Sequence, residues 1–291
     1  MVWDQAVADG AGEDITVVAG RFFDMTLAAI MVSVDFDRAC KARVGLAADL
    51  ADRFRCALIG VAGWPLLEGP REKVSQSKLA ERALEELQSL EGKFRKIAGN
   101  ITGPVEWRSS MDFPREFIAN EVRAADLLVI GQSMLPGDIA HTYDPGTIIL
   151  AAGRPVLVVP SEVTRLALSR VLIAWKDTRE ARRAVRDAVP LLQQAKDVAI
   201  AVVHSSASER TDAQIADLVQ YFARHKVSVS QQIANVSHEK EGSILLQLAE
   251  EHRADLIVAG AYGRTRLGEW IFGGVTRDLL LNSRISCLFS N

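Results

Sequence analysis

Four glycines near the C-terminus of the chain have the spacing of an anion-binding loop. Gly260 and Gly263 are followed, after nine further residues, by Gly273 and Gly274. Because glycine has no Cβ, backbone N–H groups at these positions can approach an anion closely. The next residues begin a helical pattern, and the first N–H groups of a helix are unpaired and lie at the positive end of its dipole. This segment therefore predicts a phosphate site.

Each part of the segment also has a purely structural interpretation. The first glycine pair could form only a tight turn, and the second could only allow a helix to pack closely on a sheet. The Thr276 hydroxyl could cap that helix. Arg264 could neutralise a terminal phosphate, or Arg264 and Arg266 could be solvated loop charges. The residues alone leave these alternatives open.

The surrounding apolar patterns predict the frame that holds the glycines. Strands are expected near 169–175, 197–204, 227–234, 254–259 and 285–289, with helices near 178–193, 211–225, 242–252 and from about 274. Strands that alternate with helices specify a parallel, doubly wound sheet, which binds ligands outside the carboxyl ends of strands where the strand order reverses. The first of these strands ends at Trp175-Lys176-Asp177. We therefore expect a nucleotide with its base and ribose near 175–177 and 204–205 and its phosphates at 260–276.

The same design occurs earlier in the chain. Ala125–Gly131 matches Ala254–Gly260, and Ile30–Asp35 matches Val171–Lys176, at separations of about 130–140 residues. This spacing predicts a duplicated domain. We expect an α/β fold of two tandem domains, 27–160 and 168–291, each a doubly wound, mostly parallel five-stranded sheet with helices on both faces. Residues 1–26 lie outside the duplication, and three possibilities stay open for them: an extra strand or arm, disorder, or an upstream start before Met25.

Composition narrows the class of protein. The 291 residues are 48% hydrophobic and 24% charged, with a net charge of −3, so neither nucleic acid nor an anionic membrane surface is an expected partner. No apolar run approaches the roughly 18 residues that span a bilayer, and the first residues lack a secretory pattern. The three cysteines, Cys40, Cys56 and Cys287, are scattered and are expected to be reduced core thiols. These features predict a cytoplasmic protein without membrane partners.

The first copy has lost the features of the phosphate site. Met134 occupies the position of the second glycine, and the next helix begins at Asp144-Pro145. Asp is a favoured N-cap and Pro suits the first helical position, so a side chain replaces a ligand at this helix end. The Asp144 carboxylate would also repel phosphate. We expect no ATP in the first domain, whose roles would be packing on the second domain or binding something else.

The glycine motif resembles the universal stress protein signature, G-x2-G-x9-G-(S/T), and the resemblance extends over about residues 27–290 as two tandem domains. It implies an adenine-nucleotide alpha hydrolase-like fold, with the two sheets paired through their last strands. It further implies a site for ATP, ADP or AMP, with or without magnesium, and a regulatory stress role. The implied nucleotide-binding residues are Trp175, Lys176, Asp177, Gly260, Gly263, Arg264, Gly273, Gly274, Val275 and Thr276.

The chain departs from the family pattern at two of these positions. Gly274 stands where the family usually has Ser or Thr, which removes one hydrogen bond to phosphate worth about 1–2 kcal/mol. Lys176 stands where the family tends to have an Asp that bonds the nucleoside, with Asp177 directly beside it. Either Asp177 serves after a small register change, or Lys176 points toward phosphate, or both are surface residues. Binding weaker than in members with the full motif is expected.

Three functions remain in contention. The first is a stress-response regulator that binds an adenine nucleotide in its C-terminal domain and acts as a nucleotide-dependent switch. The second is a nucleotide-free interaction scaffold, and the third is an ATP-consuming transferase on the same fold. The sequence offers no obvious general base, so slow ATP hydrolysis is the most that is expected of it as an enzyme. Duplication supplies a domain pair within the chain, while pairing of two chains stays open.

Overall fold

A computed structural model describes residues 26–66, 75–132, 143–204, 209–235, 241–263 and 274–291. The strands are β1 Ala29–Ser33, β2 Ala57–Gly63, β3 Val105–Ser110, β4 Leu127–Gly131, β5 Val156–Val159, β6 Arg170–Trp175, β7 Asp197–His204, β8 Ser230–Asn235, β9 Leu256–Gly260 and β10 Ser286–Ser290. The helices are α1 Cys40–Phe54, α2 Gln76–Ala98, α3 Pro114–Glu121, α4 Pro145–Ala152, α5 Arg179–Leu192, α6 Glu209–Arg224, α7 Glu241–Glu251 and α8 Gly274–Asn282, and a 3₁₀ turn, η1, covers Val122–Ala124.

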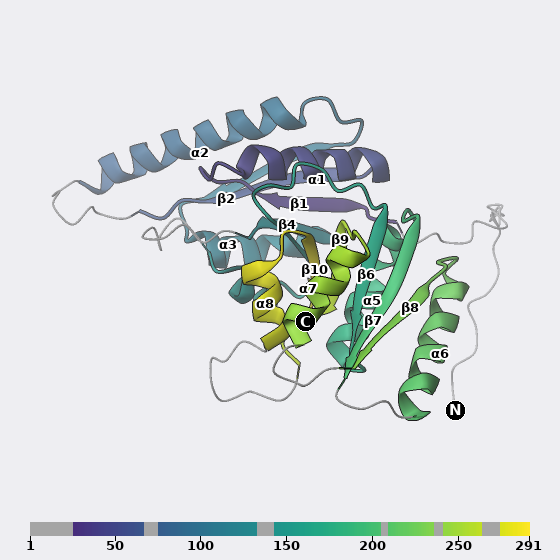
Figure 1. Cartoon of the computed structure of the whole chain (residues 1–291). Coiled ribbons are helices and arrows are strands. Elements are labelled where there is room, and N and C mark those ends of the chain that lie inside the picture. Colours follow the sequence, from purple (N-terminus) through teal and green to yellow (C-terminus); the bar gives the residue numbers. More distant parts are fainter. Residues whose placement is uncertain (1–25, 67–74, 133–142, 205–208, 236–240, 264–273) are drawn as a thin grey trace, which may run out of the picture.

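All these strands join one sheet in the order β3-β2-β1-β4-β5-β10-β9-β6-β7-β8. The N-terminal half (β1–β5) and the C-terminal half (β6–β10) repeat one parallel, doubly wound order, as the sequence predicts. The halves meet where β5 and β10 pair antiparallel, with Leu157 opposite Leu288 at the centre. The sheets are thus paired through their last strands. Because the seam is antiparallel, the carboxyl ends of the two sets of strands lie on opposite edges of the continuous sheet. The sheet also twists, so that in Figure 1 β1 and β2 run across the view while β6 and β7 run down it.

Strand order reverses between β1 and β4 in the N-terminal half and between β6 and β9 in the C-terminal half. At each of these points the connection after one strand leads to one face of the sheet, and the connection after its neighbour leads to the other face. The carboxyl ends of the two strands therefore lie open between helices. A doubly wound sheet binds its ligands at such a point. The fold therefore offers two topologically equivalent positions, one on each edge.

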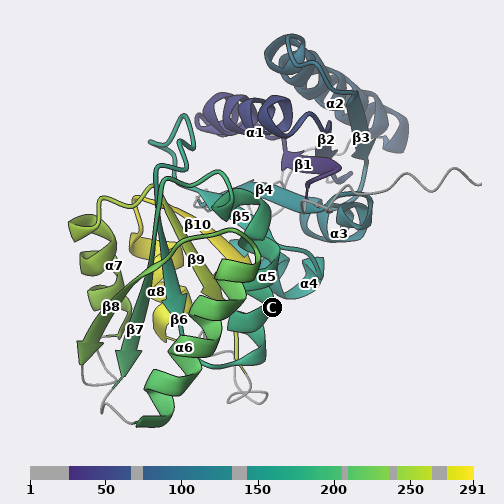
Figure 2. The same cartoon turned by 90° about the vertical axis from the view of Figure 1, so that its right-hand side faces the viewer.

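Two apolar cores cover the two faces of the sheet, and each draws residues from both halves. Residues of α1, α2, α5 and α6 pack on one face, and residues of α3, α4, α7 and α8 pack on the other. Figure 2 shows α5 and α6 on the opposite side of β6 and β7 from α7 and α8. Since both cores continue across the seam, burial of apolar surface ties the halves together.

The repeated Ala-Asp-Leu sequence before β4 and β9 has a structural role in both copies. Asp126 accepts hydrogen bonds from the N–H groups of Ala28 (2.7 Å) and Ala29 (3.1 Å) at the start of β1. Asp255 accepts one from the N–H of Ser169, at 2.7 Å, just before β6. Each carboxylate accepts hydrogen bonds from backbone N–H groups at or just before the start of the neighbouring strand. The repeat therefore marks how the strands are joined, at the edge opposite the candidate ligand position.

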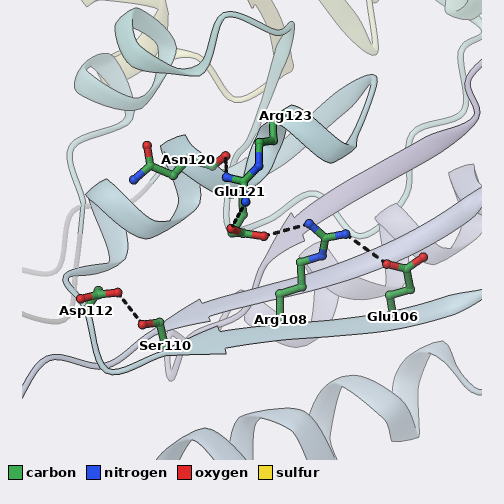
Figure 3. A network of polar contacts seen from close by, with 7 residues as sticks. All are labelled: Glu106, Arg108, Ser110, Asp112, Asn120, Glu121 and Arg123. Carbon is green, nitrogen blue, oxygen red and sulfur yellow. Dashed lines mark hydrogen bonds and ion pairs between the residues drawn. The ribbon is translucent and has the colours of Figure 1, made fainter.

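The edge strand β3 is fixed to α3 by charged side chains. Arg108 lies 2.8 Å from the Glu121 carboxylate and 3.4 Å from that of Glu106, and Arg123 also contacts Glu121, as Figure 3 shows. Charged side chains on an edge strand disfavour pairing with a second sheet. This network therefore serves the fold and lies away from the glycine motif.

Several element boundaries differ by one to three residues from the sequence prediction. The strand expected near 227–234 is Ser230–Asn235, and the helix expected near 211–225 begins at Glu209. The later strand start follows from the end of α6, where Lys226 adopts a left-handed φ of 61° and the N–H of Val227 bonds the carbonyl of Phe222. In the described part of the chain, no helix is long and apolar enough to cross a membrane. All three cysteines are free and buried, as expected.

Candidate functional site

The ends of β6 and β9 lie side by side in the C-terminal half. Ala174 is in register with Ala259, so the segment after Trp175 and the glycine loop after Ala259 leave the sheet together. The helices α5, α7 and α8 all begin at this edge, because each follows a parallel strand. The structure thus places the end of β6 beside residues 260–263, the described start of the glycine segment.

The described glycines of the motif differ in what their surroundings require. A Cβ on Gly260 would lie 2.4 Å from the backbone N of Ala181, so glycine is needed for β9 to pack on the first turn of α5. A Cβ on Gly263 would lie 3.6 Å from Glu180 Oε2, an ordinary contact, and one on Gly274 would have no atom within 4 Å. Packing explains Gly260 but neither of the other two.

Tyr262, between the two loop glycines, has an unusual backbone. Its φ of 58° lies in the left-handed region, which costs a residue with a Cβ roughly 1–2 kcal/mol. The side chain packs against the apolar core that contains α4 and α8. Burial raises the pKa of its hydroxyl, and the Asp144 carboxylate of the N-terminal half raises it further. Tertiary packing, which spans both halves, therefore holds this part of the loop.

The three residues at the end of β6 have different surroundings. Trp175, one of the implied nucleotide-binding residues, is buried in the core. Lys176 is largely exposed, and its Nζ lies 3.7 Å from the Glu241 carboxylate at the start of α7. Asp177 forms an ion pair with Arg182 at 2.6 Å. The two polar residues therefore already have partners on the rim of the site.

Glu180 is a site residue that the sequence analysis did not identify. Its side chain is only 2% exposed, lies beside Gly263 and forms an ion pair with Arg179. Burial alone raises the pKa of a carboxyl, but hydrogen bonds from Arg179, its own backbone N–H and Thr178 outweigh burial and lower the pKa of Glu180. The carboxylate is therefore ionised at neutral pH. Its sequence signal is an acidic residue in the first helical turn after the N-cap Thr178.

The first turn of α8 contributes the remaining described residues. Gly274 is exposed, Val275 is partly buried against the core, and Thr276 is buried. The first N–H groups of this helix have no partner within the helix and are directed to the carboxyl edge. Arg264 and Gly273 lie outside the described residues, as do Arg266, Met134 and residues 1–25. β7 ends at His204, beside β6.

Comparison with known proteins identifies the C-terminal half. The model of the universal stress protein family matches residues 168–290. The C-terminal half of the chain belongs to this family. A comparison with curated protein sequences found no significant match.

Solved structures extend the fold over both halves of the chain. A universal stress protein from Archaeoglobus fulgidus DSM 4304 is 15% identical, with a TM-score of 0.68 over 91% of this chain and 98% of the other. A functionally unknown protein from Pseudomonas aeruginosa PAO1 is also 15% identical, with a TM-score of 0.50 over 91% of this chain and 92% of the other. The whole chain therefore has the tandem form of the universal stress protein fold.

The equivalent position in the N-terminal half is filled by side chains of the protein itself. Arg43, 2% exposed, lies 2.7 Å from the Asp35 carboxylate, and its Nε donates to the Ser33 carbonyl at 3.0 Å. A Cβ on Gly131 would lie 2.5 Å from Arg43 Nη1. Burial lowers the pKa of Arg43, but Asp35 and the other nearby groups outweigh it and the pKa is raised. A charged guanidinium therefore lies at the carboxyl ends of β1 and β4. The equivalent position in the C-terminal half is at the ends of β6 and β9, where the glycine loop begins.

Further contacts close the same position. The Tyr143 hydroxyl lies 2.7 Å from the Ser33 hydroxyl and accepts a hydrogen bond from the Gly131 N–H at 3.2 Å. Asp144 caps α4 by accepting from the Thr147 N–H at 3.0 Å, with Pro145 at the first helical position. The capping predicted from Asp144-Pro145 is thus confirmed, and the Asp35 carboxylate faces an arginine of its own half.

Proposed function

We propose that the C-terminal half binds one adenine nucleotide, ATP, ADP or AMP, and that the chain is a cytoplasmic stress-response regulator that switches with nucleotide. One observation carries this proposal: β6 and β9 end side by side at the point where strand order reverses, and β9 leads into the glycine motif that precedes α8. The family membership of residues 168–290 supports it.

The glycines indicate where the phosphates would bind. Packing accounts for Gly260, whereas Gly263 and Gly274 have room for a Cβ that the sequence does not supply. Backbone N–H groups of Gly263, Gly274 and Thr276 would hold phosphate oxygens, and the helix dipole of α8 would add to the attraction. The sequence adds Arg264 and Gly273 to this set. Magnesium, if present, would arrive bound to the phosphates.

The nucleoside would lie toward the ends of β6 and β7. Lys176 and Asp177 contribute there only if they share or exchange their present partners, Glu241 and Arg182. This requirement, together with glycine in place of Ser or Thr at position 274, supports weaker binding than a full motif would give. The proposal includes no catalytic residue and no more than slow hydrolysis.

The N-terminal half is proposed to bind no nucleotide. The Arg43 guanidinium fills the position beside Gly131, and its charge is neutralised by Asp35 rather than by a phosphate. Opening this position would require the buried Arg43 guanidinium to move away from Asp35, and separating a buried charge from its partner is costly. The stoichiometry expected is one nucleotide per chain.

The first test identifies the ligand. Purified protein is denatured, and the released small molecules are separated and identified by mass spectrometry; nucleotide-free protein is then titrated with ATP, ADP and AMP in a calorimeter. Release of an adenine nucleotide, or binding of one per chain, supports the proposal. No release and no binding heat would instead favour the nucleotide-free scaffold, and two nucleotides per chain would overturn the role given to Arg43.

A substitution locates the site. Gly263→Ala adds a Cβ that the protein accommodates, so it is expected to leave the thermal midpoint nearly unchanged while weakening ATP binding about tenfold. Gly92→Ala, on an exposed surface of α2 with no atom within 4 Å of the added Cβ, is the matched control. Equal affinity of both variants and the wild type would place the phosphates elsewhere.

A further inference from the structure

A polar side chain of the N-terminal half, that of Gln132, reaches across the seam to α8. Gln132 follows β4 directly, and its Nε2 donates to the carbonyl of Leu280 at 2.8 Å and to that of Ser283 at 2.9 Å. These carbonyls lie at the C-terminal end of α8, the helix whose first turn belongs to the candidate site. The contact joins residues 148 and 151 positions apart in the sequence.

These two bonds replace partners that the helix itself cannot supply. The last four carbonyls of a helix lack intrahelical donors, so a side-chain donor there fixes the direction of the helix end. Gln132 is well anchored for this task, because its own backbone N–H donates to the Val159 carbonyl at 3.1 Å. The donor is thereby held by the sheet of the N-terminal half.

Fixing one end of α8 also fixes the other. The helix has nine residues, about two and a half turns, and behaves as a short rod. One side packs on α7, where a Cβ on Gly242 would lie 2.2 Å from the Asp278 carboxylate. A small tilt at Leu280 would therefore redirect the N–H groups of Gly274 and Thr276 in the first turn of the helix.

We propose that Gln132 is a positioning residue for the candidate site: it acts through α8 and holds the first turn of that helix in the direction that phosphate binding requires. This inference rests on the proposed function for its consequence, but its structural core concerns the ligand-free protein. It gives the N-terminal half a specific role, support of the site in the other half.

The first test needs no nucleotide. Hydrogen exchange of the full-length, ligand-free protein is measured by mass spectrometry for Gln132→Ala and for Gln132→Glu, which keeps the shape but removes both donors. The matched control is Gln193→Ala, because Gln193 Nε2 likewise donates to a backbone carbonyl, that of His225 at 3.1 Å, away from α8. Both Gln132 variants are expected to raise exchange within 274–282, while the control leaves it unchanged. Unchanged exchange in the Gln132 variants would overturn the proposal.

The second test separates positioning from general destabilisation. If Gln132 acts through α8, the loss concerns the phosphates alone. ATP affinity is then expected to fall about tenfold in Gln132→Ala, adenosine affinity to stay unchanged, and Gln193→Ala to bind both ligands as the wild type does. An equal loss for ATP and adenosine would indicate a merely structural role and contradict the proposal. Wild-type protein that binds neither ligand would reject the proposed function, and the exchange experiment would still decide whether Gln132 positions α8.

Discussion

Gly274 has the most open surroundings of the described glycines in the motif. No atom lies within 4 Å of a Cβ added there, and its φ is not in the left-handed region. A serine therefore fits the helix start without displacing anything. Its hydroxyl would lie beside the N–H groups proposed to bind phosphate.

We expect Gly274→Ser to tighten ATP binding roughly fivefold, because one added hydrogen bond contributes about 1 kcal/mol. Calorimetric titration measures this change, and Gly92→Ser provides a control at an equally open position. Adenosine affinity should not change. Weaker ATP binding in Gly274→Ser would mean that phosphate does not contact the first turn of α8.

Arg43 is a buried charged residue of the N-terminal half. We expect Arg43→Met to lower the free energy of unfolding by about 2 kcal/mol, since it removes the hydrogen bond to the Ser33 carbonyl and the ion pair with the partly exposed Asp35 carboxylate. Urea denaturation measures the loss. The control is Arg95→Met, an exposed i,i+4 pair with Glu91, for which about 0.5 kcal/mol or less is expected. Similar losses in the two variants would show that the Arg43–Asp35 pair stabilises the protein no more than an exposed pair does.

At the scale of elements, most helices and strands were predicted from the local spacing of apolar residues. Helix α5, expected near 178–193, has buried residues three or four positions apart, at Ala181, Ala184, Ala188 and Leu192. The strands of both halves appear as short apolar runs because helices cover both faces of the sheet. Boundaries were less accurate where a chain reversal used hydrogen bonds back into the preceding helix, as at Val227.

Two glycines, one in α2 and one in β2, are expected to change the stability of the protein in opposite directions when each is replaced by alanine. Gly92 lies on the exposed side of α2, so Gly92→Ala is expected to stabilise the protein by about 0.5–1 kcal/mol. Gly60 lies in β2, where a Cβ would be 2.8 Å from Trp107 and 2.9 Å from Phe94, so Gly60→Ala is expected to destabilise it. Thermal unfolding distinguishes the two variants. A loss of stability in Gly92→Ala would contradict the exposed helical position of Gly92.

At the scale of the whole molecule, the continuous sheet and its shared cores protect all three thiols. Burial raises the pKa of Cys40, of Cys56 to about 11 and of Cys287 to about 12. A raised pKa leaves very little thiolate, the reactive form, at pH 8. We expect iodoacetamide at pH 8 to modify none of the three in the native protein and all three in urea, as counted by intact mass. Rapid native labelling of Cys287 would indicate that the seam between β5 and β10 opens.

The sequence by itself determined the α/β class, the duplication, the position of the glycine motif, the Asp144 cap and the reduced state of the cysteines. These follow from local patterns, such as apolar period, glycine spacing and capping residues, which act within a few positions of the chain. Only the tertiary structure decided that Gly260 is needed for packing, that Arg43 fills the equivalent position beside Gly131, and that Gln132 supports α8. These contacts join side chains far apart in the sequence, so their chemistry depends on which elements the sheet order places together.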